Sequence, residues 1–418
     1  MTLAKKPRLA KGTSQRPRYL ALCPRNTESL VAAELLALPG VSDVELWSSA
    51  VSFSGDLAAL YRANLNLRCA SRVLRVLGDS RCDHPDDLYE AVRALPWEEF
   101  LSPKGTLAVN ANGETKALTN TMFTAQKTKD AVVDRFRDRL GRRPSVETQR
   151  PNLRINVQLY QKQGEPRVLV AADSSDPPLH QRGYREQAGP APLKENLAAA
   201  LYALTVDSGN CSTHGKEAVH TTVLHPTSPT RKHLAPIVDL FCGSGTLLAE
   251  AGLSALGVAP GLHREFGFMR WRDFDARLWQ AIKAEAKANV SLADGVFLFG
   301  SDVNSAAIKG ATRNLNRAGL PGFFQLGTCD FRDARPPPSE PGIVLCNPPY
   351  GERLGQNTEL AELYRALGDT LKRRFVGYRA YVFTANLAMA KQIGLRASER
   401  HPLFNGMLES RLLRFDLY

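Results

Sequence analysis

Hydrophobic positions in the second half of the chain follow two alternating patterns. Short apolar runs predict strands over residues 236–241, 296–301, 323–329, 342–346 and 378–384. Between them, apolar residues at helical spacing predict helices over residues 246–256, 274–290, 304–318 and 359–375. An Asn405-Gly406 turn then leads into an apolar run over 408–417, which predicts a hairpin at the sheet edge. This alternation is typical of a parallel, doubly wound α/β sheet with helices on both faces.

The first half of the chain has a less regular pattern. A helix over 27–37 and strands over 44–47 and 51–53 suggest a small α+β unit. Further strands are predicted over 107–110 and 153–159, and Val132, Val133, Phe136 and Leu140 form the apolar stripe of a helix. Residues 176–190 are rich in proline and glycine and predict a linker. A helix follows it, marked by Leu193, Leu197, Leu201 and Leu204.

Length and composition indicate a soluble protein of two or three domains. The chain has 418 residues, of which 43% are hydrophobic and 23% charged. No apolar run approaches the roughly 18 residues that a membrane span needs, and no apolar segment follows the basic N-terminus as in a secretion signal. Seven cysteines without a CxxC pair indicate a reducing compartment, and we expect a cytoplasmic protein. Four histidines within 207–235 lack metal-ligand spacing, so we expect no metal.

Positive charge is concentrated in two places. The net charge is +12, and residues 1–18 carry six basic side chains and no acid, which predicts a basic disordered tail. A transit peptide is the alternative for this tail. The helix region 127–143 has seven basic and three acidic residues, an excess of four, and either contacts nucleic acid or is a solvated helix face. The RNA-binding candidates are Lys127, Lys129, Arg135, Arg139, Arg142 and Arg143.

A glycine-rich turn after the first strand of the second half is a candidate cofactor site. Gly243 and Gly245 permit positive φ and close approach of a ligand, and the helix start at Thr246 offers free N–H groups. The turn matches neither the dinucleotide GxGxxG pattern nor a P-loop.

Acidic residues end the next two strands. Asp302 suits ribose hydroxyls, although an insertion around 258–275 must separate it from the glycine turn. Asp330 could accept a hydrogen bond from an adenine amino group while the Phe331 ring packs on the base. Either acid could instead be a helix N-cap.

The strand over 342–346 runs directly into Asn347-Pro348-Pro349-Tyr350. The two prolines fix the turn and leave the Asn347 side chain and the Pro348 carbonyl as paired acceptors. An exocyclic amino group has two hydrogens to donate, and holding both stabilises the charge that develops when its nitrogen attacks. Tyr350 can stack on a flipped-out base. These four residues are the candidate catalytic residues, and Asn347 is also a candidate cofactor contact.

These motifs resemble class I methyltransferases that act on exocyclic amino groups, and in particular the bacterial 23S ribosomal RNA guanine N2-methyltransferases. The resemblance is carried by residues 182–185 (RGYR), 191–196 (APLKEN), 242–246 (CGSGT), 259–263 (APGLH), 279–286 and 347–353 (NPPYGER). It implies a Rossmann-like seven-stranded methyltransferase domain over 191–418, preceded by a ferredoxin-like segment over 19–55 and a THUMP RNA-binding domain over 56–175. Leu240, where many relatives have proline, and the long 207–235 stretch depart from the family pattern.

The resemblance also implies a reaction. S-adenosylmethionine would be the methyl donor, and the target would be a guanine N2 in 23S ribosomal RNA or its precursor particle, specifically guanine 2445. The residues that would line the methionine end of the cofactor are Asp239, Cys242, Gly243, Ser244, Gly245 and Thr246. Lys194 and Glu195 would lie on the helix that covers the cofactor. No membrane or obligate protein partner is expected, nor a second methyltransferase domain. The alternatives are a transfer-RNA guanine N2-methyltransferase, a DNA adenine-N6 or a C5-pyrimidine enzyme, and a non-catalytic RNA-binding assembly factor.

Overall fold

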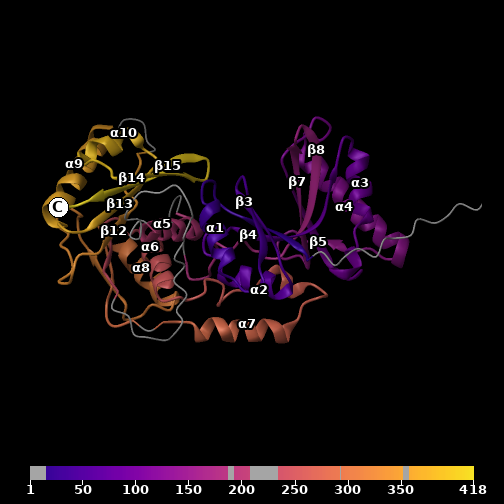
Figure 1. The fold of residues 1–418 in the computed structure, drawn as a ribbon, viewed down its shortest axis with the longest axis horizontal. Coiled ribbons are helices and arrows are strands. Elements are labelled where there is room, and N and C mark those ends of the chain that lie inside the picture. Colours follow the sequence, from indigo (N-terminus) through magenta and orange to yellow (C-terminus); the bar gives the residue numbers. More distant parts are fainter. Residues whose placement is uncertain (1–15, 187–192, 208–233, 292, 352–356) are drawn as a thin grey trace, which may run out of the picture.

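A computed structural model describes residues 16–186, 193–207, 234–291, 293–351 and 357–418. Almost all of the predicted basic tail and of the 207–235 stretch therefore lies outside the described residues. The chain forms an elongated molecule, with the C-terminal α/β domain at one end and the segment that contains α3 and α4 at the other (Figure 1). None of the helices within the described residues is long and apolar enough to cross a membrane.

The N-terminal part is built on one eight-stranded sheet with the order β2-β3-β1-β4-β8-β7-β5-β6. Its first elements have the βαββαβ order of a ferredoxin-like fold: β1 (Arg18–Leu22), α1 (Glu28–Leu36), β2 (Ser42–Trp47), β3 (Ala50–Ser54), α2 (Leu57–Asn66) and β4 (Arg72–Arg81). The others are α3 (Pro85–Ala94), η1 (Trp97–Glu99), β5 (Thr106–Asn112), α4 (Thr121–Leu140), β6 (Ser145–Val146), β7 (Leu153–Lys162) and β8 (Glu165–Asp173). The expected boundary between residues 55 and 56 falls between β3 and α2.

The C-terminal domain is an α/β fold with the sheet order β11-β10-β9-β12-β13-β15-β14. Its elements are α5 (Glu195–Asp207), β9 (Ile237–Asp239), α6 (Thr246–Ala255), η2 (Gly267–Arg270), α7 (Ala276–Ala288), β10 (Leu298–Asp302), α8 (Ser305–Arg317), β11 (Phe324–Thr328), β12 (Ile343–Cys346), α9 (Asn357–Arg374), β13 (Arg379–Thr384), α10 (Leu387–Ala390), η3 (Lys391–Ile393), β14 (Glu399–Asn405) and β15 (Leu408–Asp416). The first five strands are parallel, and β15 is antiparallel to both neighbours. The predicted seven-stranded Rossmann-like fold is thus confirmed.

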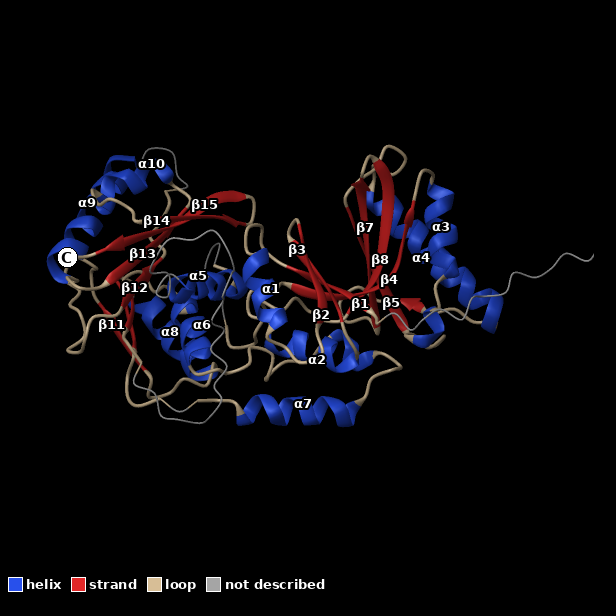
Figure 2. Cartoon of the chain, in the orientation of Figure 1, coloured by secondary structure: helices blue, strands red, loops and turns tan. Residues whose placement is uncertain are grey.

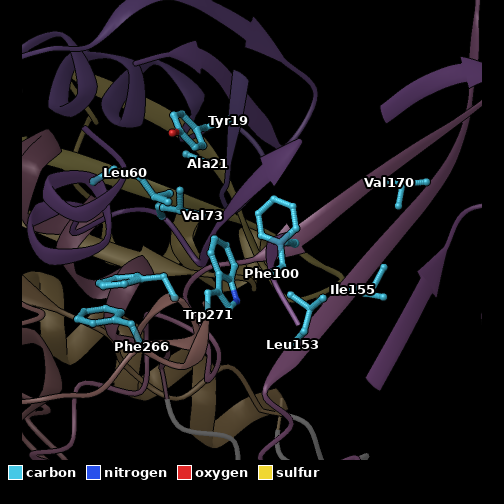
Figure 3. Packing of buried hydrophobic residues seen from close by; sticks show 14 of the residues in the cluster. Tyr19, Ala21, Leu60, Val73, Phe100, Leu153, Ile155, Val170, Phe266 and Trp271 are labelled. Carbon is cyan, nitrogen blue, oxygen red and sulfur yellow. The ribbon is translucent and has the colours of Figure 1, made fainter. Parts of the chain in front are cut away.

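The segment between α6 and β10 leaves the α/β domain and packs on the N-terminal module. Helix α7 lies alongside α2, away from the C-terminal sheet (Figure 2). The Trp279 ring of α7 meets the Tyr61 ring of α2 edge-on at 5.9 Å between centroids, and the Tyr61 hydroxyl accepts a hydrogen bond from the Asp275 N–H at 2.9 Å. Figure 3 shows Phe266 and Trp271 of this segment among core residues of the N-terminal sheet. The predicted insertion therefore joins the two parts of the molecule.

The predicted linker is irregular in its described part, residues 176–186, but it is firmly packed. Arg182 is buried and donates hydrogen bonds to the carbonyls of Leu179 at 2.8 Å and Arg68 at 2.5 Å. Its guanidinium also lies 3.5 Å from the Glu250 carboxylate on α6, which accepts a hydrogen bond from the Tyr184 hydroxyl at 3.0 Å. The proline and glycine content correctly indicated the lack of regular structure. It carried no information about these buried polar contacts, which tie the two modules together.

Candidate active site

Strands β9, β10 and β12 end at the same edge of the C-terminal sheet, since they are parallel neighbours in the sheet. Asp239 ends β9, Asp302 ends β10, and Asn347 directly follows β12. The carboxyl edge of a parallel sheet is where open α/β folds bind their ligands, at the point where the strand order reverses. Here that point lies between β9 and β12, so the predicted cofactor turn and the predicted catalytic turn leave adjacent strands.

The glycine turn adopts the backbone conformation that its sequence predicted. Gly243 and Gly245 have φ values of +50° and +77°, which a side chain would strain. A β-carbon at Gly245 would also lie 3.1 Å from the Ala311 side chain on α8. The Asn314 side chain of the same helix donates to the Ser244 carbonyl at 2.9 Å. The turn is therefore held between β9 and α8 with its N–H groups at the start of α6.

The Asp302 carboxylate supports the glycine turn directly. One oxygen accepts the Gly243 N–H at 3.0 Å, and the other accepts the Asn304 N–H at 2.9 Å. Asp302 itself is partly exposed at the end of β10. A carboxylate that holds the turn and still faces solvent can position the cofactor loop as well as bind ribose hydroxyls.

Asp239, Cys242 and Thr246 lie below the surface of the turn. Asp239 is buried, and this burial raises the pKa of its carboxyl to about 7, although the Phe241 N–H donates to it. Burial also raises the pKa of the Cys242 thiol, so this side chain is a packing group and not a reactive thiolate. The Thr246 hydroxyl lies 3.1 Å from the Ser244 hydroxyl and accepts a hydrogen bond from Arg185.

Asp330 and Phe331 follow β11, but they already have partners within the protein. The Asp330 carboxylate accepts from the backbone and side chain of Arg332, at 2.8 and 2.9 Å. Phe331 is buried, its ring centroid 4.9 Å from that of Phe241, and the Arg332 guanidinium lies over it. The predicted contact of these two residues with an adenine stays a prediction. Phe241 is less buried than Phe331 and lies nearer to the glycine turn in sequence, so it is the more accessible of the two rings.

The Asn347–Tyr350 turn is held from several sides. The Tyr350 hydroxyl donates a hydrogen bond to the Asn347 side-chain oxygen. The Tyr350 carbonyl accepts from Asn386 at 3.0 Å, and the Pro349 carbonyl accepts from the Tyr364 hydroxyl at 3.3 Å. Pro348 is buried and Pro349 is exposed, whereas Asn347 and Tyr350 are half-buried. The two side chains expected to hold the target base are therefore accessible at the sheet edge and positioned by their neighbours.

Sequence reasoning gave no role of its own to Arg185. The side chain donates at 2.8 Å to both the Thr246 hydroxyl and the Leu193 carbonyl, and it lies 3.4 Å from the Glu195 carboxylate. It thus ties the start of α6, next to the glycine turn, to the start of α5. Glu195 is buried beside this contact, whereas Lys194 is exposed. The RGYR motif was the only signal for Arg185, and its partners lie on two other elements.

One of the residues predicted to contact RNA, Arg135 on helix α4, is not available at the surface. Arg135 is buried, and its guanidinium pairs with the Glu98 carboxylate at 2.9 Å and donates to the Arg93 carbonyl at 2.8 Å. Arg135 therefore forms a structural ion pair with Glu98 and is not a surface cation that could contact RNA. The partner lies on η1, outside the helix, so a charge count within the helix missed it.

The other cations of this helix differ in how far they are neutralised. Lys127 pairs with Asp86 at 2.6 Å, and Lys129 pairs with Asp130 at 2.5 Å. Arg139 is 61% exposed, and the Glu98 carboxylate lies 3.8 Å from its guanidinium. Arg142 and Arg143 follow the helix and are exposed. The C-terminal end of α4 is thus the part of the predicted surface that offers cations to a phosphate backbone.

Comparisons with known families match all three parts of the chain. The family model described as an RMKL-like methyltransferase domain matches residues 225–414. A THUMP domain model matches residues 82–163, and an RlmL ferredoxin-like domain model matches residues 18–74. Clusters of metal-ligating side chains were not found among the residues that the structure describes.

Curated relatives cover most of the chain. The Synechocystis sp. protein slr0064, named as a candidate RNA methyltransferase, is 39% identical over 96% of this chain and 97% of its own length. A ribosomal RNA large subunit methyltransferase K/L from Methylococcus capsulatus is 40% identical over 96% of this chain. The match covers 51% of that relative, so this chain spans about half the length of the K/L enzymes.

Two solved structures that share this fold are named as methyltransferases. SMU.472, a candidate methyltransferase solved in complex with SAH, has a TM-score of 0.80 and 26% identity over 97% of this chain and 99% of its own. A structure from Listeria monocytogenes, titled as an N6-adenine-specific DNA methylase on prediction, has a TM-score of 0.78 and 29% identity over 96% of both chains. The similarity covers both the N-terminal module and the α/β domain.

Proposed function

Because this chain belongs to the RNA methyltransferase family that includes slr0064, we propose that it transfers a methyl group from S-adenosylmethionine to a guanine N2 in large-subunit ribosomal RNA. The observation that carries the proposal is the pair of turns on adjacent strands. The glycine turn leaves β9, and Asn347–Tyr350 leaves β12 at the same edge. A cofactor on the first turn and a base on the second would meet at this edge.

The residues at the glycine turn fit S-adenosylmethionine. The positive φ of Gly243 and Gly245 lets a ligand approach the backbone, and the turn opens the helix whose N–H groups suit a carboxylate. Asp302 would hold the ribose, with Asp239, Cys242, Ser244 and Thr246 around the methionine end. When bound, the cofactor supplies an electrophilic methyl group.

At the second turn, this chain's own residues would hold the target amino group. The Asn347 side-chain oxygen would accept one amino hydrogen, and the Pro348 carbonyl would accept the other. This stabilises the positive charge that develops on the nitrogen during attack. The Tyr350 ring would stack on the extruded base, and its hydroxyl holds the Asn347 amide in place. The extra proton can leave to water afterwards, so no general base is required before transfer.

The choice of ribosomal RNA as substrate rests on the relatives. The K/L enzymes are named for the large-subunit RNA, and a THUMP model matches the N-terminal module. The guanine N2 specificity, and guanine 2445 as its position, follow from the sequence resemblance. We place the protein in the cytoplasm, where it would meet this RNA or its precursor particle.

The test is to map modified guanines in ribosomal RNA from a strain that lacks the gene. One guanine should lose its N2-methyl group and regain it when the wild-type gene is restored. A restored gene carrying Asn347→Ala should fail to rescue it. Loss of a methyl group from transfer RNA instead would assign the enzyme to the alternative substrate. No change in either RNA would contradict methylation as the function.

The role of Asp302 can be tested by cofactor binding alone. Asp302→Ala removes the acceptor of the Gly243 N–H as well as the proposed ribose contact. We expect S-adenosylmethionine binding to weaken by about 1.5–3 kcal/mol, which is the range for hydrogen bonds to a charged group. Isothermal calorimetry measures this. The control is Glu340→Ala, an exposed acid at the other edge of the sheet, which should leave the Kd unchanged. An unchanged Kd for Asp302→Ala would reject the assignment.

The RNA-binding role of the α4 end predicts a change in salt dependence. Reversing Arg139, Arg142 and Arg143 to glutamate should flatten the plot of log affinity against log salt by about 0.7–0.9 for each phosphate that is no longer neutralised. Filter binding to large-subunit RNA over a salt series measures the slope. Cofactor affinity should not change, since α4 lies in the other module (Figure 1). The matched reversal of Arg365, Lys372 and Arg373 on α9 should keep the wild-type slope. If the two triple variants share one slope, α4 does not bind RNA.

A further inference from the structure

The turn between β14 and β15 exposes two large apolar side chains. Met407 is 96% exposed and Leu408 is 49% exposed. Gly406, with a φ of +64°, closes the tight turn between the two strands. Single exposed apolar side chains are common on protein surfaces, so their exposure alone means little. Their position relative to the candidate active site gives them a role.

The strand register places this turn beyond the active-site edge. Strand β13 pairs with β15 from Arg379 opposite Asp416 to Thr384 opposite Arg411. Residues Leu408 to Ser410 therefore extend past the carboxyl end of β13, by about 10 Å at roughly 3.4 Å per residue. The neighbouring strand β12 ends two residues before β13 does, because its last residue, Cys346, pairs with Val382. The Asn347–Tyr350 turn lies at this edge, so the hairpin projects beside it.

The strands that lead into the hairpin turn pack directly on Tyr350, the residue proposed to stack on the target base. Leu403 and Leu412, one from each strand, belong to the buried cluster against which Tyr350 packs. Burial raises the pKa of the Tyr350 hydroxyl, and a side-chain interaction with Asn405 opposes this rise. On its other side, β14 contacts the N-terminal module, where Asn26 donates to the Pro402 carbonyl at 3.3 Å. The hairpin thus lies between the proposed RNA-handling module and the proposed base pocket.

We propose that Met407 and Leu408 enter the RNA base stack when the target guanine swings out onto Asn347 and Tyr350. This inference rests on the proposed function. A base inside a helix must leave the stack before a side chain can reach its amino group, and unstacking costs a few kcal/mol. An apolar side chain inserted at the vacated step offsets part of this cost. Methionine suits the role because its unbranched thioether adapts to an irregular gap.

The test compares two RNA duplexes that carry the guanine mapped above. In one, the guanine pairs with cytidine, and in the other it faces an abasic site and is already unpaired. Met407→Ser should lower kcat/KM on the paired duplex by about tenfold or more, since the serine side chain no longer offsets unstacking. On the unpaired duplex, the kcat/KM of Met407→Ser should stay within about twofold of the wild-type value. Met407→Leu, which keeps an apolar side chain, should restore most of the activity on the paired duplex.

The matched control is Val376→Ser. Val376 is 54% exposed and lies just before β13, at the opposite edge of the same sheet. It should not alter activity on either duplex. The inference would be overturned if Met407→Ser lowered kcat/KM equally on both duplexes, or did not lower it on the paired duplex. Either result would leave the proposed function intact, provided that the wild type methylates the RNA. If the strain that lacks the gene shows no loss of an N2-methyl group, the proposed function fails, and this inference fails with it.

Discussion

Replacement of Asn347 by alanine is expected to lower the methylation rate constant by about 10²–10³-fold, by analogy with the removal of one donor from an oxyanion hole. The Pro348 carbonyl survives the substitution, so one of the two proposed acceptors of the amino group remains. The hydrogen bond to Asn347 would strengthen as charge develops on the nitrogen, and the effect of removing it should therefore appear in kcat more than in KM. Single-turnover methylation of large-subunit RNA measures it.

Two further measurements separate this role from a structural one. Cofactor affinity of Asn347→Ala should equal that of the wild type, because the proposed role of this side chain is to hold the base; a weaker affinity would instead support the cofactor contact that the sequence also suggested for Asn347. Tyr350→Phe removes the hydroxyl that donates to Asn347 but keeps the ring and both acceptors. It should lose much less activity than Asn347→Ala. A near wild-type rate for Asn347→Ala would mean that the Asn347–Tyr350 turn only ends a strand.

Most of the α/β domain could be predicted because its longer helices and strands each carry their own pattern. The strands are apolar runs bounded by turns, and helices such as α8 are amphipathic, so periodicity located them to within about two residues. The N-terminal module was harder to predict. Helix α2 has no single apolar face, since Leu60, Tyr61 and Ala63 are buried together with other residues around its axis. A helix buried on most sides leaves no helical period in the sequence.

The candidate site also has parts that the sequence could predict and parts that it could not. The glycine turn and the Asn347–Tyr350 turn lie within one strand and the residues after it, and short-range chemistry was enough to identify both. Contacts between distant segments left no such signal. The Glu98 carboxylate that neutralises Arg135 lies 37 positions away, and Arg185 reaches Thr246 from 61 positions away. The cofactor contacts assigned to Asp330 and Phe331 remain predictions.

The largest long-range feature is the insertion that carries α7 from the α/β domain to the N-terminal module. The predicted insertion explained the long interval between Gly245 and Asp302, but its sequence did not indicate where it packs. Phe266, Phe268 and Trp279 join the core of the other module. This interface, together with the buried contacts of Arg182, holds the proposed RNA-handling surface at a fixed place relative to the candidate active site.

Trp279→Ala is expected to destabilise the protein by about 3–5 kcal/mol, the usual cost of removing a fully buried tryptophan. Its ring is 2% exposed and lies edge-on to Tyr61, Phe266 and Phe268, at centroid distances of 5.3–5.9 Å. Urea unfolding followed by circular dichroism should show the loss of stability as a lower midpoint. Trp279→Phe should recover part of it because it keeps an aromatic edge. Leu36→Ala, at a 70% exposed position on α1, should change stability by less than about 0.5 kcal/mol. If Trp279→Ala unfolds at the wild-type midpoint, α7 does not pack on the N-terminal module, and the two modules are not held together by this insertion.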